Sequence, residues 1–181
     1  EGHVDVAKVL LENGADVNAV DQYKSTALHD ATERGYVDIV KLLIQNGAEL
    51  DAVQKNNCTA LHYAVGNGRV DIAKVLLENG ADANAVDDEE ESVLCLATST
   101  KGHFDTAFLL LCFGAEIDKK AYDSSKILCK IKDRLDLLRA GERIGTSLMS
   151  KEESQFMWNL AFSFTIQHRA AAFKAYNAIR S

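Results

Sequence analysis

The sequence predicts an all-α-dominated solenoid, in which short helical units stack side by side. Three observations support this fold class. A segment recurs every 33 or 34 residues, with leading glycines at Gly2, Gly35, Gly68 and Gly102. Apolar residues within each copy fall at helical spacing, and a Gly-Ala pair followed by polar, turn-rich sequence closes each copy. A unit of this length cannot cover its own apolar face, so such units are stable only in stacks.

A short first helix is predicted at the start of each full unit. The segments "TALHDA" at Thr26, "TALHYA" at Thr59 and "SVLCLA" at Ser92 occupy the same register position. Threonine and serine side chains accept hydrogen bonds from the free N–H groups of a helix start. We therefore expect a helix of about eight residues after each of them, ended by the glycine turn that follows.

A second helix and a finger-like loop are predicted to follow each glycine turn. Val37, Ile39, Val40, Leu42 and Leu43 lie at helical spacing in the first full copy. Asn-Gly then ends the helix, since glycine suits the left-handed conformation of a helix C-cap. The next segment, "AELDAVQKNNC", is too polar and turn-rich for another helix. It predicts a β-hairpin finger.

The motif T-x-L-H-x-A, followed by G-H-x-D-V and G-A-D-V-N at a period of 33, resembles the ankyrin repeat. The resemblance covers residues 1–121, with a degenerate echo to about 140. It implies helix-turn-helix units with β-hairpin fingers, divided into the second half of a repeat (1–21) and three full repeats (22–54, 55–87, 88–121). Residues 122–181 are expected to form an irregular helical C-terminal cap.

The sequence departs from the family pattern in its fingers. The position that usually holds glycine carries Lys24, Asn57 and Glu90. If these residues keep the positive φ of the pattern, Lys24 and Glu90 are strained, and we expect fingers less regular than is usual in the family. The fourth copy also contains one extra residue in "TSTKG", which predicts a bulged turn before Gly102.

The first copy begins at its second helix. Leu10, Leu11 and the apolar side of residues 4–9 would therefore lack the neighbouring first helix. Either further repeats precede them in a longer protein, or this edge packs on another chain.

No residue set in the sequence predicts catalysis, a metal site or a cofactor, and we expect a non-enzymatic protein. The resemblance assigns His29 and His62 to hydrogen bonds that tie the repeats together. Equivalent positions in neighbouring repeats lie too far apart to share a zinc ion. Cys58 has no histidine or basic activator in its own loop.

Charge is distributed unevenly along the chain. Residues 1–118 carry a net charge of −13 and residues 119–181 a net charge of +6. The acidic part would repel nucleic acid, and no run of apolar residues is long enough for a membrane span. The expected location is the cytoplasm, or a host cytosol if the protein is a delivered effector.

Five consecutive acids, Asp87 to Glu91, occupy the third finger, whereas the same positions of the other fingers read "DQYKS" and "QKNNC". Their spacing does not match a calcium-binding loop. Two interpretations remain open. The finger is a solvated loop partly neutralised by Lys55 and by Lys119 or Lys120, or it is an acidic end of the binding surface that selects a basic partner segment.

The last sixty residues predict two helices. One runs from Ile127 to Ala140, and a longer one begins after a capping box at Ser150 and reaches about Ile179. Apolar residues lie on two sides of the long helix. It either caps the last repeat or offers one stripe for self-association, which contains Trp158, Phe162, Ile166 and Phe173.

The ankyrin resemblance implies that the protein is a scaffold that binds another protein through a concave groove, and the acidic charge favours a partner with a basic segment. First-helix faces and finger tips would line this groove. The alternatives are a targeting or regulatory module of a larger enzyme or host-directed effector, and a module that self-associates through the C-terminal helix or the exposed N-terminal edge. Carried over by position, the expected binding residues are Gln22, Tyr23, Ser25, Asp30, Glu33, Arg34, Lys55, Asn56, Tyr63, Asn67, Asp88, Glu89 and Glu91.

Overall fold

The computed structural model describes residues 3–99 and 104–117, which lie in one compact unit, Glu1–Ser125. The predicted helical solenoid is confirmed. The helices of this part are α1 (Val4–Glu12), α2 (Ala27–Arg34), α3 (Val37–Gln45), α4 (Ala60–Gly66), α5 (Val70–Glu78), α6 (Val93–Ser99) and α7 (Phe104–Cys112).

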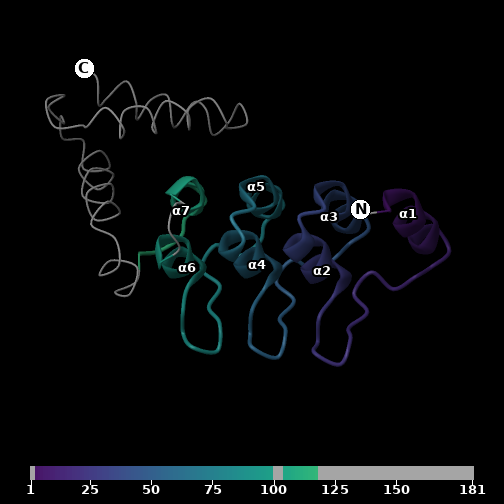
Figure 1. Ribbon diagram of the computed structural model, residues 1–181, viewed down its shortest axis with the longest axis horizontal. Helices are drawn as coiled ribbons and strands as arrows, with labels where there is room; N and C mark the ends of the chain where they lie inside the picture. Colours follow the sequence, from purple (N-terminus) through teal and green to yellow (C-terminus); the bar gives the residue numbers. More distant parts are fainter. Residues whose placement is uncertain (1–2, 100–103, 118–181) are drawn as a thin grey trace, which may run out of the picture. The chain divides into compact units, whose positions relative to one another are not determined.

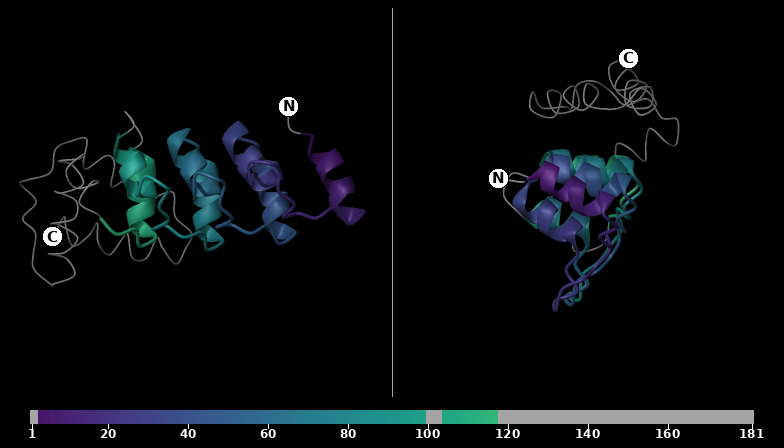
Figure 2. Two further views of the ribbon diagram at one scale, coloured as in Figure 1. Left: turned by 90° about the horizontal axis from the view of Figure 1, so that it is seen from below. Right: turned by 90° about the vertical axis from the view of Figure 1, so that its right-hand side faces the viewer.

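The helices form two parallel rows (Figure 1). The first helices of the repeats, α2, α4 and α6, make one row, and the second helices, α1, α3, α5 and α7, make the other. Each helix from α2 to α7 contacts its partner within the repeat and its equivalents in the neighbouring repeats, whereas α1 contacts its equivalent α3. The fingers extend from the row of first helices, and all three project in the same direction when viewed along the stack (Figure 2).

Thr26 and Thr59 begin α2 and α4 with capping boxes, as their position predicts. The Thr26 backbone N–H donates to Nδ1 of His29 at 3.2 Å, and the Thr26 side chain accepts from the backbone N–H of His29. Thr59 and His62 repeat this arrangement. At α6, the backbone N–H of Cys95 donates to Oγ of Ser92 at 3.0 Å. All three predicted caps are therefore confirmed.

The second helices end in a repeated C-terminal motif. In α3, the Gly47 N–H donates to the Ile44 carbonyl and the Ala48 N–H donates to the Leu43 carbonyl, both at 3.0 Å. This is a Schellman motif, which requires a left-handed residue, and Gly47 has φ of 85°. The Asn46 side chain adds a bond to the Leu42 carbonyl at 2.8 Å.

The three fingers share one tight turn. In the first finger, the Lys24 N–H donates to the Asp21 carbonyl and the Asp21 N–H donates to the Ser25 carbonyl. Lys24, Asn57 and Glu90 have φ of 60°, 59° and 56°, so the predicted positive φ is confirmed at each. The fingers are thus more alike than expected. Their β pairing is limited to isolated bridges, Val20 with Thr26 and Val86 with Ser92, rather than ladders.

The core lies between the two helix rows and contains mainly leucine, isoleucine, valine and alanine. Leu28, Leu61 and Leu94 are at most 1% exposed and occupy the same register position in successive first helices. In α1, by contrast, no residue is buried, and Val6, Val9 and Leu10 are 55–57% exposed. The apolar side of α1 is therefore exposed, whereas the second helices that follow it contain buried residues.

Several expectations lie outside the described residues. They concern the bulged turn before Gly102, Lys119 and Lys120, the two C-terminal helices, and the self-association stripe of Trp158, Phe162, Ile166 and Phe173. Within the part that the structure describes, no helix combines the length and apolar character needed to cross a membrane.

Candidate functional site

The candidate site is the surface formed by the fingers and by the outward side of α2, α4 and α6, here called the front surface. It contains all thirteen expected binding residues. Tyr23 is 59% exposed at the tip of the first finger, whereas Ser25, Tyr63 and Glu91 are half-buried. The remaining members are exposed: Gln22, Asp30, Glu33, Arg34, Lys55, Asn56, Asn67, Asp88 and Glu89.

Backbone hydrogen bonds join successive fingers. The Lys55 N–H donates to the Tyr23 carbonyl at 3.1 Å, and the Asp88 N–H donates to the Asn56 carbonyl at 3.2 Å. The Asn57 side chain adds a bond to the Val86 carbonyl at 2.9 Å. The fingers therefore hold their side chains in a fixed order along the stack instead of moving as separate loops.

A chain of side-chain hydrogen bonds, here called the polar chain, links the first two full repeats. The Tyr63 hydroxyl donates to Oε1 of Gln54 at 2.6 Å, and Nε2 of Gln54 donates to Oγ of Ser25 at 2.8 Å. Oγ of Ser25 then donates to Oδ1 of Asp30 at 3.1 Å. Every proton in this chain points towards Asp30, which fixes the orientation of each member.

The surroundings of Tyr63 affect both the pKa of its hydroxyl and the position of its ring. Burial raises the pKa of Tyr63, the Asn56 side chain lowers it, and the nearby carboxylates of Glu33 and Asp30 raise it further. The hydroxyl is therefore protonated at neutral pH. The ring makes an edge contact with His29, with centroids 6.1 Å apart and planes at 88°. Tyr63 is thus held from its buried side while part of it stays exposed.

Tyr23 and Lys55 contact each other across the first two fingers. Nζ of Lys55 lies 5.8 Å from the centroid of the Tyr23 ring, within the range of a cation–π interaction. The hypothesis that Lys55 partly neutralises the acidic finger instead places its ammonium near the third finger. The structure turns its ammonium towards Tyr23, because the ring face attracts a cation.

The third finger forms the same tight turn as the other two. Oδ1 of Asp87 accepts from the N–H groups of Glu89 and Glu91 at 2.9 and 2.8 Å. Its acids act on the neighbouring finger, since the pKa of Cys58 is raised by burial and then by Asp87, Asp88 and Glu91. Among the described residues, histidine, cysteine and carboxylate side chains form no group of three that could hold a metal ion.

The two repeat histidines hold neighbouring parts of the stack together. Nε2 of His29 lies 3.3 Å from the Cys58 carbonyl of the next repeat, while Nδ1 takes part in the cap. His62 makes the same cap, but its Nε2 has no hydrogen-bond partner within the described residues. Burial lowers the pKa of both side chains. Their expected structural role is consistent with this geometry.

Sequence reasoning missed two front-surface residues, Gln54 and Leu96. Gln54 connects Tyr63 to Ser25, although Asp21 and Asp87 hold its register position in the other fingers. Leu96 is half-exposed and follows Tyr63 by 33 residues, so the repeat register alone could have found it. Asn67 has a structural role beside its exposure, because its side chain donates to the Tyr63 carbonyl at the end of α4.

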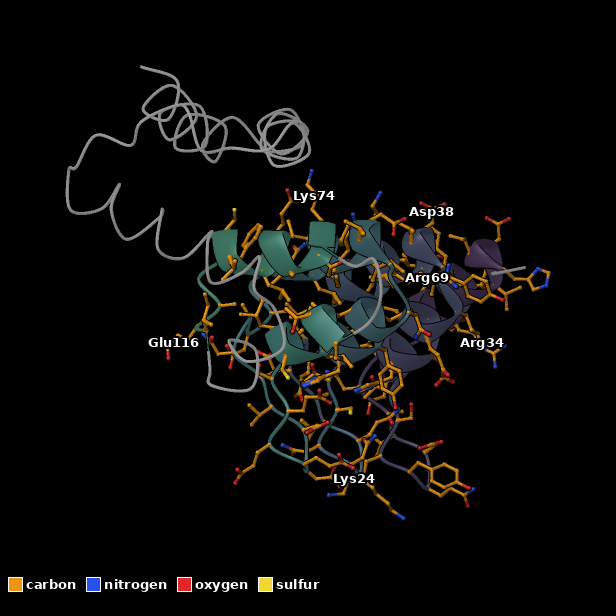
Figure 3. All side chains as sticks on the ribbon, turned by 60° about the vertical axis from the view of Figure 1, so that its left-hand side comes forward. Lys24, Arg34, Asp38, Arg69, Lys74 and Glu116 are labelled. Carbon is orange, nitrogen blue, oxygen red and sulfur yellow. The ribbon has the colours of Figure 1, made fainter. Side chains whose placement is uncertain are left out.

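Charged side chains also occupy the opposite surface. Figure 3 shows Lys24 among the fingers, on the other side of the helices from Asp38 and Lys74, which belong to the second-helix row. In α1 the Lys8 and Glu12 side chains form an exposed pair at 3.9 Å. Such pairs contribute little to stability. The opposite surface nevertheless provides matched positions for control substitutions.

A scan against protein-family models matches residues 1–44 and 28–77 to a model described as ankyrin repeats (many copies). Residues 1–77 of the chain therefore contain ankyrin repeats. The same helix pairs and turns continue into α6 and α7, beyond the matched residues. Ankyrin repeats are in general protein–protein interaction modules, and the family is typically non-enzymatic. A search of curated proteins found no significant match to the chain.

Proposed function

We propose that this ankyrin repeat protein is a non-enzymatic scaffold that binds a basic segment of another protein on its front surface. One observation carries the proposal. Successive repeats use the same residues for packing, but different residues on the front surface, where the fingers read "DQYKS", "QKNNC" and "DDEEE". The packing alone does not require this variation, whereas recognition of a particular partner does.

The front surface offers the side chains that protein interfaces use. Tyrosine is enriched among the residues that dominate binding energy, and Tyr23 and Tyr63 are both accessible. The acids of the third finger would attract a basic segment and set its orientation more than they would raise affinity. We infer that the tyrosines anchor the partner and that the finger steers it.

Partner capture with the wild-type chain and with Tyr23→Ala/Tyr63→Ala tests the anchoring role. We expect the double substitution to remove the main partner, since hot-spot residues each contribute about 2 kcal/mol or more. A control is Val70→Ala at the start of α5, which also shortens an exposed side chain outside the front surface. An unchanged set of partners after the tyrosine substitutions would contradict the proposal.

Charge reversal tests the steering role on the partner identified in this way. Asp88→Lys/Glu89→Lys/Glu91→Lys is expected to lower the association rate by about tenfold or more at low salt and to reduce its salt dependence. Dissociation should change less. Stopped-flow kinetics at several salt concentrations measure both rates. If the rate and its salt dependence stay the same, the third finger is only a solvated loop.

Self-association through the N-terminal edge is a second candidate. Its support is the exposure of Val6 and Leu10, whose equivalents Ile72 and Leu76 in α5 are fully buried. Sedimentation velocity of the full chain over a range of concentrations tests it. A monomer at every concentration would remove this candidate. The role as part of a larger enzyme or effector stays a prediction.

A further inference from the structure

The best-defined feature of the front surface is the corner between α2 and α4, where Tyr63, Asp30 and Glu33 meet. The inference drawn from this corner rests on the proposed function and specifies which side chain of the partner would be recognised. Asp30 and Glu33 are exposed and lie three residues apart, on the same side of α2. The Tyr63 ring contacts His29 of α2, which Asp30 follows directly and Glu33 follows by about one turn. Hydrogen bonds through Gln54 and Ser25 join the Tyr63 hydroxyl to Asp30.

The hydrogen bonds at this corner leave the exposed carboxylates of Asp30 and Glu33 as acceptors for a partner. The Tyr63 proton is committed to Gln54 and the Ser25 proton to Asp30. No cation of the described residues forms an ion pair within 4 Å of Asp30 or Glu33. Arg34, in the same helix, is therefore not their partner at that distance. The corner combines two carboxylates with a phenol, and it is complementary to a cation with several donors.

Lys55 on Tyr23 shows that the front surface accepts a cation against a tyrosine ring. Nζ of Lys55 lies 5.8 Å from that ring, so this position is already occupied from within the chain. Tyr63 differs, because its ring contacts His29 and its hydroxyl is linked through Gln54 and Ser25 to the Asp30 carboxylate. The two tyrosines are therefore unequal, and Tyr63 is the one available to an incoming cation.

The next repeat adds an apolar contact. Leu96 takes the register position of Tyr63 and is half-exposed. Gly66 lies beside it, since a Cβ on Gly66 would be 3.5 Å from Cδ2 of Leu96. Neighbouring helices lie about 8–10 Å apart, and an extended chain advances about 3.3 Å per residue. One repeat therefore corresponds to about three residues of an extended partner segment.

We propose that the corner of Tyr63, Asp30 and Glu33 binds an arginine of the partner protein, and that Leu96 receives an apolar side chain about three residues away. A guanidinium is planar, carries five N–H donors and stacks on aromatic rings. It can therefore donate to both carboxylates while it lies against Tyr63. A lysine ammonium satisfies the charge but not this fork-like geometry.

Selection from a displayed library of random 12-residue peptides tests the arginine preference. The full chain is immobilised as the wild type, as Asp30→Asn/Glu33→Gln, and as the control Asp38→Asn/Glu78→Gln, which neutralises two exposed acids of the second-helix row. Asparagine can still accept from Ser25, so the polar chain is preserved. Circular dichroism and thermal unfolding confirm that each variant folds.

We expect peptides selected on the wild type and the control to share an arginine with an apolar residue about three positions away. This pattern should disappear on Asp30→Asn/Glu33→Gln. In a selected peptide, replacing the arginine with lysine should weaken binding by about fivefold or more, and citrulline should weaken it further, because charge-assisted bidentate bonds are lost.

Three outcomes would overturn the inference: no binding peptide, no arginine enrichment, or an enrichment that survives on Asp30→Asn/Glu33→Gln. Equal affinity for arginine and lysine would overturn the guanidinium assignment in the same way. These failures are distinct from failure of the proposed function. Loss of the protein partner with Tyr23→Ala/Tyr63→Ala, without an arginine preference, would leave the scaffold role standing.

Discussion

The pKa of the Cys58 thiol depends in part on the acidic third finger. The thiol is half-buried, and its pKa is raised first by burial and then by Asp87, Asp88 and Glu91. A thiol reacts through its thiolate, so a raised pKa slows alkylation at neutral pH. Burial and the neighbouring carboxylates together therefore lower the reactivity of Cys58, although it lies in a surface loop.

We predict that Asp88→Asn/Glu91→Gln increases the rate of Cys58 alkylation by iodoacetamide at pH 7.5. Removal of two nearby negative charges lowers the cost of forming the thiolate. Mass spectrometry of the digested protein measures the rate at this cysteine. Asp38→Asn/Glu78→Gln is the control and should leave the rate unchanged. An equal rate in all three proteins would show that the third finger does not influence Cys58.

The buried histidines make stability depend on pH. Burial lowers the pKa of His29 and His62 below the ordinary 6.5, so the unfolded chain binds protons more readily than the folded chain. Their contribution to the free energy of unfolding is fully present above pH 6.5. It is lost as the pH falls through the lowered pKa values that the two histidines have in the folded chain. Each histidine contributes at most one proton to this dependence.

We predict that the free energy of unfolding in urea decreases between pH 7.5 and pH 5.5. In His29→Gln/His62→Gln this decrease should be smaller, because the two groups that titrate are absent. Glutamine can replace histidine as the capping-box acceptor. The double variant is still expected to be less stable at pH 7.5, since it loses the contact between Nε2 of His29 and the Cys58 carbonyl and replaces two buried rings. The same pH slope in both proteins would assign the dependence to other groups.

Among the elements, the fingers contain the clearest local strain. Glu90 has φ of 56°, a conformation that costs a non-glycine residue about 1 kcal/mol. Glycine adopts it freely but loses more chain entropy on folding. The strain relief is the larger effect at this position, because the turn hydrogen bonds fix the backbone in all three fingers.

We therefore predict that Glu90→Gly raises the free energy of unfolding by about 0.5 kcal/mol. Glu89→Gly is the matched control. It removes the same side chain and charge at the neighbouring position, where φ is not positive, and should be neutral or destabilising. Urea titration of the three proteins gives the comparison. Equal stabilisation by both changes would indicate relief of charge repulsion, not of backbone strain.

The helices, caps and turns could be predicted because they follow from short-range chemistry at a fixed period. Thr26, Thr59 and Ser92 each sit where a helix start needs an acceptor, and Lys24, Asn57 and Glu90 inherit their φ from the turn. The polar chain could not be predicted in this way. It depends on side-chain conformations from different repeats, and Gln54 breaks the pattern of its own register position.

Lys55 illustrates the same limit. Its finger lies between two others, one with a tyrosine at its tip and one with five acids. Net charge favours the acids, and the sequence offers no means of weighing this against an aromatic contact. The structure places the ammonium over Tyr23. Which neighbouring finger a side chain turns towards depends on side-chain geometry, and a repeat pattern contains no information about it.

For the whole molecule, stability is expected to vary along the array. In a repeat protein each unit contacts only its neighbours, so a unit with one neighbour opens more easily. No residue of α1 is buried, whereas Ile72, Ala73 and Leu76 of α5 are fully buried. Within the described part of the chain, α1 is therefore expected to open more easily than α5.

We predict that backbone amides of α1 exchange with solvent deuterium faster than those of α5 by about tenfold or more under native conditions. The two helices have nearly the same sequence, "VDVAKVLLE" and "VDIAKVLLE", so intrinsic exchange rates are closely matched. Hydrogen exchange followed by mass spectrometry measures both. Comparable protection would mean that something covers α1 in solution, and a dependence on protein concentration would identify a second copy.

The polar chain also removes an ambiguity that every periodic array faces. A ligand that recognised only the shared features of the repeats could dock equally well one unit further along, and the complex would exist in several shifted alignments. Tyr63, Gln54, Ser25 and Asp30 occur together once, because the next repeat carries Leu96, Asp87, Cys58 and Tyr63 in their places. Within the described repeats, a partner that reads this chain has a single alignment.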